Sequence, residues 1–196
     1  LDLLGNMVNI TLVYSTALIL ASLGAIFSEK SGVENVGVEG LMTIGAFTSA
    51  VCAHFLQAQG GMTGASLWLS ALAAVIAGAL FSLIHAVATI TFKSNQVISG
   101  IVINFLSAGL TLYLVKLLFN GSATTDTLGT VFAKAEIPLL SSIPFLGKAL
   151  FTAYPITYVA LALVAVSYYV LFKTPLGLRL RATGEHPGAV DTLGVN

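Results

Sequence analysis

The residues best suited to chemistry gather near the amino-terminal end, in residues 28–45, SEKSGVENVGVEGLMTIG. This stretch holds the carboxylates of Glu29, Glu34 and Glu39 and the amine of Lys30, and it lies between two apolar segments. A charged side chain near the centre of a bilayer costs about 2.5 to 3.5 kcal/mol even on lenient insertion scales. We therefore expect these groups to lie in a cytoplasmic loop or to line a polar path.

Glu39 has two interpretations. The apolar run 41–56 is short for a membrane span, and it crosses a bilayer only if its helix begins near Val36. That start places Glu39 in the first helical turn, where the helix dipole favours a carboxylate by about 0.3 to 1 kcal/mol. Glu39 is thus either a stabilising charge at a helix start or part of a transport path.

Two further polar groups lie inside apolar segments. Asn104 falls in the middle of a predicted span, so its amide either bonds a neighbouring helix or contacts a polar solute. His85 lies near the inner end of another span. It is either a proton-linked group or, as its isolation favours, a side chain hydrogen-bonded to a helix partner.

The composition predicts an all-α, polytopic membrane protein. Hydrophobic residues make up 57% of the chain and charged residues only 8%, against about 25% in a soluble domain. The net charge is zero, which argues against a nucleic-acid partner. A single cysteine, Cys52, excludes an internal disulfide and a cysteine-based metal site. Gly147 and Lys148 make no P-loop because Ser142 stands where its first glycine belongs. No His/carboxylate cluster has metal-ligand spacing either, so we expect neither cofactor nor metal.

Five segments are predicted to span the membrane. They are residues 7–27, 41–56 with a start near Val36, 65–92, 97–119 and 156–172. The third carries a small residue at every fourth position, a pattern that lets another helix approach closely. These residues are Ser66, Ser70, Ala74, Gly78, Ser82 and Ala86.

Basic residues predict the orientation. Lys173, Arg179 and Arg181 follow the fifth span closely, which places residues 174–196 in the cytoplasm. By alternation, 28–35 and 93–96 are cytoplasmic, 57–64 and 120–155 are external, and the amino terminus is outside. Within the long external segment, residues 139–151 are mildly amphipathic and predict an interfacial helix.

The closing run is the second informative segment. Pro175 and Gly177 are expected to end the fifth span, residues 184–187 to form a turn, and Pro187 to begin a short helix that reaches residue 193. A short helix held between two spans is suited to transmit motion from a partner protein. An ordinary solvated loop is the alternative interpretation, because it has the same spacing.

Three blocks carry a family resemblance: SEKSGVENVGVEGLM followed by IGAF, NQVISG followed by Asn104, and the closing run from Thr174. In this order they resemble the ABC-importer permeases of the branched-chain amino acid and simple-sugar type, and most of all the nucleoside branch. Three positions depart from the family pattern. Lys30 replaces an Arg, Glu34 replaces an apolar residue and Gln96 replaces an acid.

The resemblance implies a single permease domain over residues 1–196, the amino-terminal part of such a permease, with 174–196 as its ATPase-docking loop. It implies import of nucleosides or simple sugars through a bacterial cell (inner) membrane. The implied partners are ABC ATPase subunits, a second permease and an extracellular or periplasmic solute-binding protein. ATP would be bound and hydrolysed on a partner chain, so this chain would be neither an enzyme nor a cofactor protein.

The resemblance and the polarity of the residues together give two candidate sets. The expected substrate path comprises Asn35, Gly37, Glu39, Gly40, Asn95, Gln96, Ser99 and Asn104. The expected ATPase-coupling set comprises Arg179, Arg181, Gly184, Glu185, Pro187, Ala189 and Gly194.

Two other classes of function compete with this interpretation. An ion-gradient-driven secondary transporter would use Glu39 and His85 as proton carriers. An intramembrane enzyme is disfavoured, because no two candidate catalytic groups share a predicted membrane depth.

Overall fold

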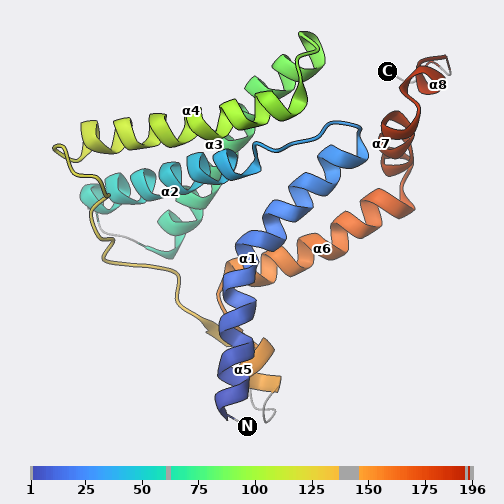
Figure 1. Ribbon diagram of the computed structural model, residues 1–196. Helices are drawn as coiled ribbons and strands as arrows, with labels where there is room; N and C mark the ends of the chain where they lie inside the picture. The colour runs from blue at the N-terminus through green and yellow to red at the C-terminus, as the bar shows by residue number, and fades with distance from the viewer. Residues whose placement is uncertain (1, 61–62, 137–145, 193, 195–196) are drawn as a thin grey trace. The chain divides into compact units, whose positions relative to one another are not determined.

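The computed structural model describes residues 2–60, 63–136, 146–192 and 194. Five of its helices are long and apolar enough to cross a membrane, which confirms the all-α, polytopic class and every predicted span (Figure 1). They are α1 (Asp2–Lys30), α2 (Val38–Gly60), α3 (Gly64–Ala86), α4 (Gln96–Leu118) and α6 (Pro155–Lys173). The chain divides into two compact units. One combines the segment up to Gly32 with that from Phe132 onward, and the other is Val33–Val131.

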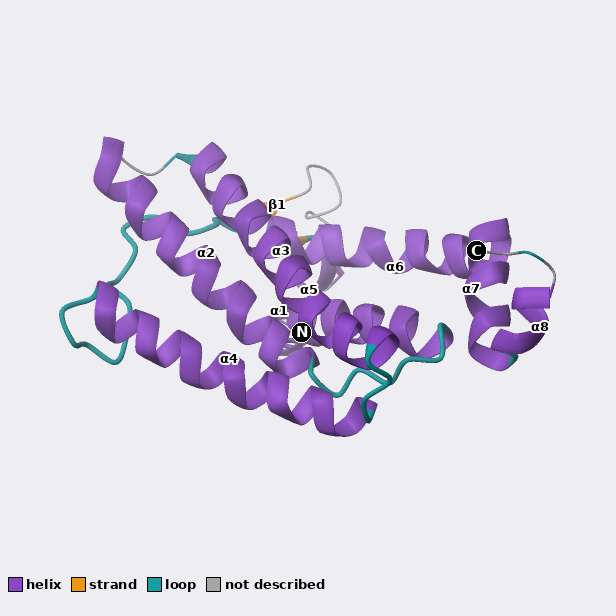
Figure 2. Cartoon of the chain, turned by 90° about the horizontal axis from the view of Figure 1, so that it is seen from above, coloured by secondary structure: helices purple, strands orange, loops and turns teal. Residues whose placement is uncertain are grey.

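The unit Val33–Val131 contains α2, α3 and α4. Helices α2 and α4 lie side by side in both views (Figures 1 and 2). Helix α3 packs on α2 through small residues. A Cβ placed on Gly45 would lie 3.8 Å from the Ala74 carbonyl oxygen, and one on Gly78 would lie 4.0 Å from the Leu41 carbonyl oxygen. The middle of the predicted small-residue stripe therefore meets α2, as close helix packing requires.

Side-chain caps set the helix boundaries in this unit. Thr63 and Ser66 cap each other's backbone N–H groups at the start of α3. Asn95 caps α4, because its Oδ1 accepts a hydrogen bond from the Ile98 N–H at 3.0 Å. The third span continues beyond α3 as a π-helical turn, η1 (Val87–Thr91), so it extends nearly to its predicted end.

The other unit is built on the pairing of α1 with α6. Their buried contact includes a hydrogen bond of 2.9 Å between the hydroxyls of Thr16 and Thr157. Two short strands, β1 (Ala135–Glu136) and β2 (Thr152–Ala153), pair antiparallel. Asn9 of α1 is only 4% exposed, and it joins this pair to the helix. Its Nδ2 donates to the Thr152 carbonyl oxygen at 2.7 Å, and its Oδ1 accepts from Lys134 Nζ at 3.0 Å.

The segment after α6 differs from the prediction. Pro175 and Gly177 were expected only to end a span, yet they begin a helix, α7 (Pro175–Glu185). Thr174 caps it by accepting from the Gly177 N–H at 3.3 Å, and Pro175 occupies the first helical position, where its missing N–H costs nothing. A Cβ on Gly177 would overlap the Val170 carbonyl oxygen, so glycine permits this tight reversal.

Two shorter helices bear on other predictions. Helix α8 (Pro187–Thr192) confirms the expected start at Pro187, and residue 193 lies outside the described residues. Of the amphipathic piece 139–151, the part before residue 146 lies outside the described residues. The remainder includes one short helix, α5 (Leu146–Leu150).

Burial in the spans is the reverse of that in a soluble protein. Small hydroxyl residues are buried, with Ser107 at 0% and Thr157 at 2% exposure, whereas Phe105 and Phe92 are each 77% exposed. Membrane helices associate through small and hydroxyl side chains because lipid is as apolar as their large side chains. This burial pattern is typical of membrane-spanning helices.

Candidate functional site

Four residues of α4 form the surface on which the candidate site is built. Gln96, Gly100, Asn104 and Ser107 recur at intervals of four, four and three residues, so they share one face of the helix. We call this face the α4 stripe. The segment that leads into α2 lies along it.

Three hydrogen bonds fix that segment to the α4 stripe. Gln96 Oε1 accepts from the Glu34 N–H at 2.7 Å. Asn104 Nδ2 donates to the Val36 carbonyl oxygen at 3.1 Å, while its Oδ1 accepts from the Gly40 N–H at 2.7 Å. Side chains of one helix thus hold the backbone of the turn that starts another.

The bond from Gly40 to Asn104 completes the start of α2. The first hydrogen bond within the helix runs from the Leu41 N–H to the Gly37 carbonyl oxygen at 3.1 Å. The Gly40 N–H is therefore one of the first N–H groups that a helix cannot satisfy itself. Asn104 supplies the missing acceptor from α4, and Asn35 Oδ1 accepts from the Gly37 N–H at 3.1 Å. Asn104 acts as a cap provided by a neighbouring helix.

Glycines allow this close approach. A Cβ on Gly40 would lie 2.5 Å from Ser107 Oγ and 2.9 Å from Asn104 Oδ1. A Cβ on Gly100 would lie 2.8 Å from the Gly37 nitrogen and 2.9 Å from Val36 Cβ. Real Cβ atoms do not approach neighbours this closely, so any larger residue at either position must push the two helices apart.

Glu39 is exposed beside this contact. It borders an open groove with a volume of about 340 Å³ between α2 and α4, whose lining includes Thr43, Ile101, Asn104 and Phe105. Thr43 donates its hydroxyl to the Glu39 carbonyl oxygen at 2.9 Å, which leaves the carboxylate unengaged. Within the described part of the chain, that carboxylate has no hydrogen bond or ion pair.

Ser99 is held by α3. Its hydroxyl lies 3.0 Å from His85 Nδ1, and His85 is only 4% exposed. This is the helix-to-helix bond that the isolation of His85 favoured. The other ring nitrogen, Nε2, is buried and has no partner among the described residues.

The eight predicted path residues therefore have different places. Glu39 presents its unpaired carboxylate to the groove, which Gly40 and Asn104 also line. Gly37, Gly40, Gln96 and Asn104 hold the start of α2 against α4, so the helix-bonding interpretation applies to Asn104. The side chains of Asn35 and Asn95 accept hydrogen bonds from nearby backbone N–H groups, and Ser99 bonds His85.

Sequence reasoning missed six residues of this arrangement. Gly100 and Ser107 complete the α4 stripe, and their spacing from Gln96 and Asn104 was a visible signal of a shared face. The other four line the groove, but they carried no such signal, because hydroxyl, aliphatic and aromatic residues are common throughout the spans. They are Thr43, Ile101, Phe105 and Ala108.

Six of the seven predicted coupling residues lie on α7 and α8, in the other unit. Arg181 donates from Nε to the Gly177 carbonyl oxygen at 3.4 Å, and its guanidinium lies 5.1 Å from the centroid of the Phe172 ring. Arg179 and Glu185 are exposed on α7, Pro187 and Ala189 are exposed on α8, and Gly194 follows with φ +69°.

Gly184 joins α7 to the end of α1. A Cβ on Gly184 would overlap the Lys30 carbonyl oxygen and would lie 3.1 Å from the Gly32 nitrogen. Gly32 itself has φ +86°, a conformation that favours glycine. The first and third sequence blocks of the resemblance therefore touch within one compact unit.

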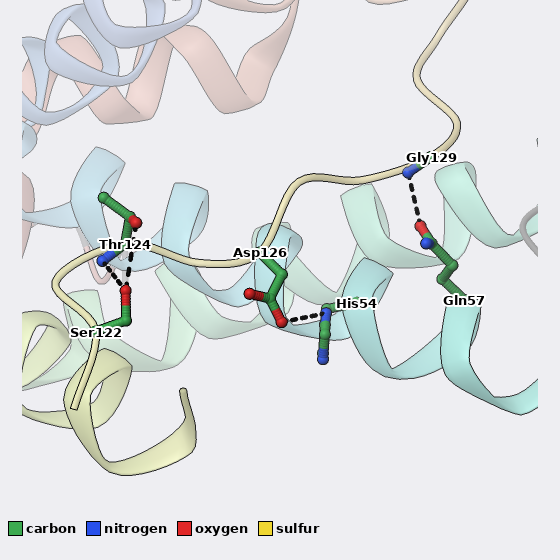
Figure 3. Close-up of polar contacts among 6 residues, drawn as sticks. All are labelled: His54, Gln57, Ser122, Thr124, Asp126 and Gly129. Atoms are coloured by element: carbon green, nitrogen blue, oxygen red, sulfur yellow. Dashed lines mark hydrogen bonds and ion pairs between the residues drawn. The ribbon is translucent and has the colours of Figure 1, made fainter. Parts of the chain in front are cut away.

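The loop after α4 is attached to the far half of α2 (Figure 3). His54 Nδ1 lies 3.9 Å from Asp126 Oδ2, and Gln57 Oε1 accepts from the Gly129 N–H at 2.9 Å. The His54 ring also packs edge-on against Phe119 at 4.9 Å. Asp126 is 71% exposed, so this ion pair adds little stability by itself.

No group of three or more residues suited to hold a metal ion occurs among the residues that the structure describes.

Known proteins resemble the chain over nearly its whole length. The family model described as the branched-chain amino acid transport system, permease component, matches residues 7–196. The guanosine ABC transporter permease protein NupQ of Bacillus subtilis is 52% identical over 100% of this chain and 60% of its own length. The nucleoside ABC transporter permease protein NupC of Lactococcus lactis is 43% identical over 94% of this chain and 57% of its own.

A more distant relative is named for a sugar. The glucose ABC transporter permease protein TsgB13 of Haloferax volcanii is 29% identical over 94% of this chain and 49% of its own length. The chain thus spans about half to three fifths of these three relatives. No solved structure is significantly similar to it. With the family model matched over residues 7–196, this multi-pass membrane protein belongs to the permease component family of the branched-chain amino acid transport system.

Proposed function

We propose that the chain is a permease subunit of an ATP-driven ABC importer and that its solutes are nucleosides. The observation that carries this proposal is the 52% identity to a guanosine permease over the whole chain. A second nucleoside permease, at 43% identity, supports the same solute class. Simple sugars are the alternative class, and they rest on lower identities, 36% to a putative glucose permease and 29% to a glucose permease.

The start of α2 is the proposed place of solute contact. Glu39 offers the groove a free carboxylate, while Asn104 and Gly40 fix the backbone that carries it. Gly37 and Gln96 act by holding that backbone against α4. A backbone held in place before the solute arrives loses little conformational entropy on binding, which favours recognition by this short segment.

The energy source in this proposal lies on other chains. The proposed partners are ABC ATPase subunits, a second permease and an extracellular or periplasmic solute-binding protein, assembled in a bacterial cell (inner) membrane. ATP hydrolysis is assigned to the ATPase subunits, so this chain is proposed to be neither an enzyme nor a holder of its own cofactor.

Helices α7 and α8 are the proposed ATPase-docking element. Arg179 and Glu185 are exposed and available to a partner. Arg181 and Gly184 bind α7 to the rest of its own unit, through Phe172 and the end of α1. A docking element needs both features, because a force received on the exposed side must reach the spans.

Uptake into vesicles tests the solute and the energy source together. The complete transporter, reconstituted with ATP, is expected to take up labelled guanosine faster than labelled glucose or leucine. Leucine as the preferred solute would refute the nucleoside assignment. Uptake that needs a pH gradient and no ATP would refute the importer, and would instead favour Glu39 and His85 as proton carriers.

Cysteine cross-linking tests the docking element. Ala189→Cys, exposed on α8, is expected to cross-link with cysteines placed on the ATPase surface. Tyr14→Cys, which is exposed within the span α1, is the matched control and is expected to give no such product. If both positions fail to cross-link at every ATPase position tried, the docking assignment is wrong.

A further inference from the structure

We propose that the groove beside Glu39 reads the Watson–Crick edge of a purine base, and that Glu39 makes it select 6-oxopurine nucleosides over adenosine. This inference rests on the proposed function and names the solute class more narrowly. It follows from three properties of the groove: its size and aromatic lining, the unpaired carboxylate, and the fixed backbone beneath that carboxylate.

The groove has the size and the wall that a base requires. Its volume of about 340 Å³ lies within the range of about 300 to 1,000 Å³ for small-molecule sites. Phe105 and Ile101 line it from α4, and the Phe105 side chain is 77% exposed. Proteins commonly bind unpaired bases by stacking them on an aromatic ring while polar groups read the base edge.

The polar groups of the groove are mostly acceptors. The Glu39 carboxylate offers two oxygens and no donor hydrogen. Thr43 already donates its hydroxyl to the Glu39 main chain, and Asn104 gives one amide hydrogen to Val36. Neither of these hydrogen bonds engages the Glu39 carboxylate, so its oxygens are free to accept hydrogen bonds from a bound molecule.

Guanine matches this arrangement and adenine does not. The N1–H and the N2 amino group of guanine are neighbouring donors, so each can meet one carboxylate oxygen, in the paired geometry that makes such bonds strong. Inosine keeps only the N1–H donor. Adenine places the N1 acceptor beside its amino donor, so the carboxylate faces one repulsive contact, which is how sites reject a wrong ligand.

The backbone that carries Glu39 is held in place on both sides. Gly40 donates its N–H to Asn104, and Val36 accepts from the same amide. The glycine contacts of Gly37 and Gly40 leave no room for α2 to move toward α4. A fixed backbone limits the positions that the carboxylate can reach, which lowers the conformational entropy lost when a base with the matching donors binds.

Substituting Glu39 by glutamine tests the donor pattern. The amide of Glu39→Gln presents one acceptor and one donor, which suits adenine, as amides in proteins pair with adenine. In competition uptake by the complete transporter, we expect the wild type to prefer guanosine, then inosine, then adenosine. We expect Glu39→Gln to shift the ratio of guanosine to adenosine by about tenfold to a hundredfold toward adenosine.

The matched control is Glu34→Gln, the same chemical change five residues earlier and outside the groove lining. It is expected to leave the base ratio unchanged. Because each variant is compared with itself across three nucleosides, a loss of folded protein cancels in the ratio. An equal ratio in wild type and Glu39→Gln, with nucleoside uptake intact, overturns this inference alone. Absence of nucleoside uptake in the wild type overturns the proposed function as well.

Phe105→Leu tests the stacking of the base on an aromatic ring separately from the hydrogen bonds to the edge of the base. Base stacking on an aromatic ring does not depend on the base, so this variant is expected to weaken apparent affinity for all three nucleosides by about tenfold. The ratio between them is expected to remain that of the wild type. Unchanged affinities in Phe105→Leu would show that no base stacks in this groove and would also overturn the inference.

Discussion

Gly40→Ala is the substitution that most directly tests the contact between α2 and α4. The added Cβ would lie 2.5 Å from Ser107 Oγ, 2.9 Å from Asn104 Oδ1 and 2.9 Å from the Ile103 carbonyl oxygen. All three atoms belong to the helix backbone or to a side chain that is already bonded. The helices must therefore separate rather than adjust one rotamer.

The expected cost is the sum of two terms. Overpacking of a well-packed contact costs about 1 to 3 kcal/mol. Separation of the helices also stretches the 2.7 Å bond from the Gly40 N–H to Asn104, and hydrogen bonds between membrane helices contribute about 0.6 kcal/mol each. Alanine offsets part of this, because it favours a helix over glycine by about 0.5 to 1 kcal/mol.

Gly45→Ala is the matched control. It lies in the same helix and gains the same preference for helix, but its Cβ would have its nearest neighbour, the Ala74 carbonyl oxygen, at an ordinary 3.8 Å. The difference between the two variants cancels the propensity term. We expect Gly40→Ala to be less stable than Gly45→Ala by about 2 to 4 kcal/mol.

Denaturation of the purified permease in mixed micelles, followed by helical circular dichroism, measures this difference. Combining Gly40→Ala with Ser107→Ala removes the closest of the three overlaps, so the double variant is expected to recover about 1 kcal/mol. Equal transition midpoints for Gly40→Ala and Gly45→Ala would refute the close packing of α2 on the α4 stripe.

Two further contacts give predictions in the other unit. Gly184→Ala places a Cβ against the Lys30 carbonyl oxygen, so this variant is expected to reduce ATP-driven uptake at least about tenfold. Gly188→Ala is the control, because its Cβ would meet nothing within 4 Å, and its uptake is expected to remain near that of the wild type. Equal uptake by both variants would contradict the role of this contact. Lys134→Met leaves the buried Asn9 side-chain oxygen without its hydrogen-bond donor, which is expected to destabilise this unit by about 1 to 3 kcal/mol. Faster amide hydrogen exchange in β1 and β2 would report this loss of stability. Unchanged exchange there would contradict it.

The spans could be predicted because length and hydropathy are local properties. Each needs only a run of about 20 apolar residues, and a polar break marks its end. The start of α2 was predictable for the same reason, since 41–56 is too short unless Glu39 lies in the first turn. Helix α7 was missed because Pro175 is compatible with both the end of one helix and the start of another. Only the bond from the Gly177 N–H to the Thr174 hydroxyl oxygen decides between them.

The sequence pointed to some members of the contact between α2 and α4, such as Gly40 and Asn104, but not to the bonds they make. Asn104 was a polar residue in a span, and the sequence left open whether it met a helix or a solute. Its two bonds join residues 64 and 68 positions away, and no local pattern encodes such pairs. The four-residue spacing of the α4 stripe was the available signal, because it places Gln96, Gly100 and Asn104 on one face.

The proposed function assigns the two candidate sets to the two units of the chain, which a short stretch of sequence joins. Gly184 of α7 contacts Gly32, and the chain runs from Gly32 to Glu39 in seven residues. Within its own unit, the backbone before Glu39 is held by Gln96 and Asn104 of α4. In the other unit, α7 is held against the end of α1 at Gly184. In the proposed function α7 receives a displacement from the ATPase, so Gly184→Ala, which disturbs that contact, is expected to impair transport without touching the groove.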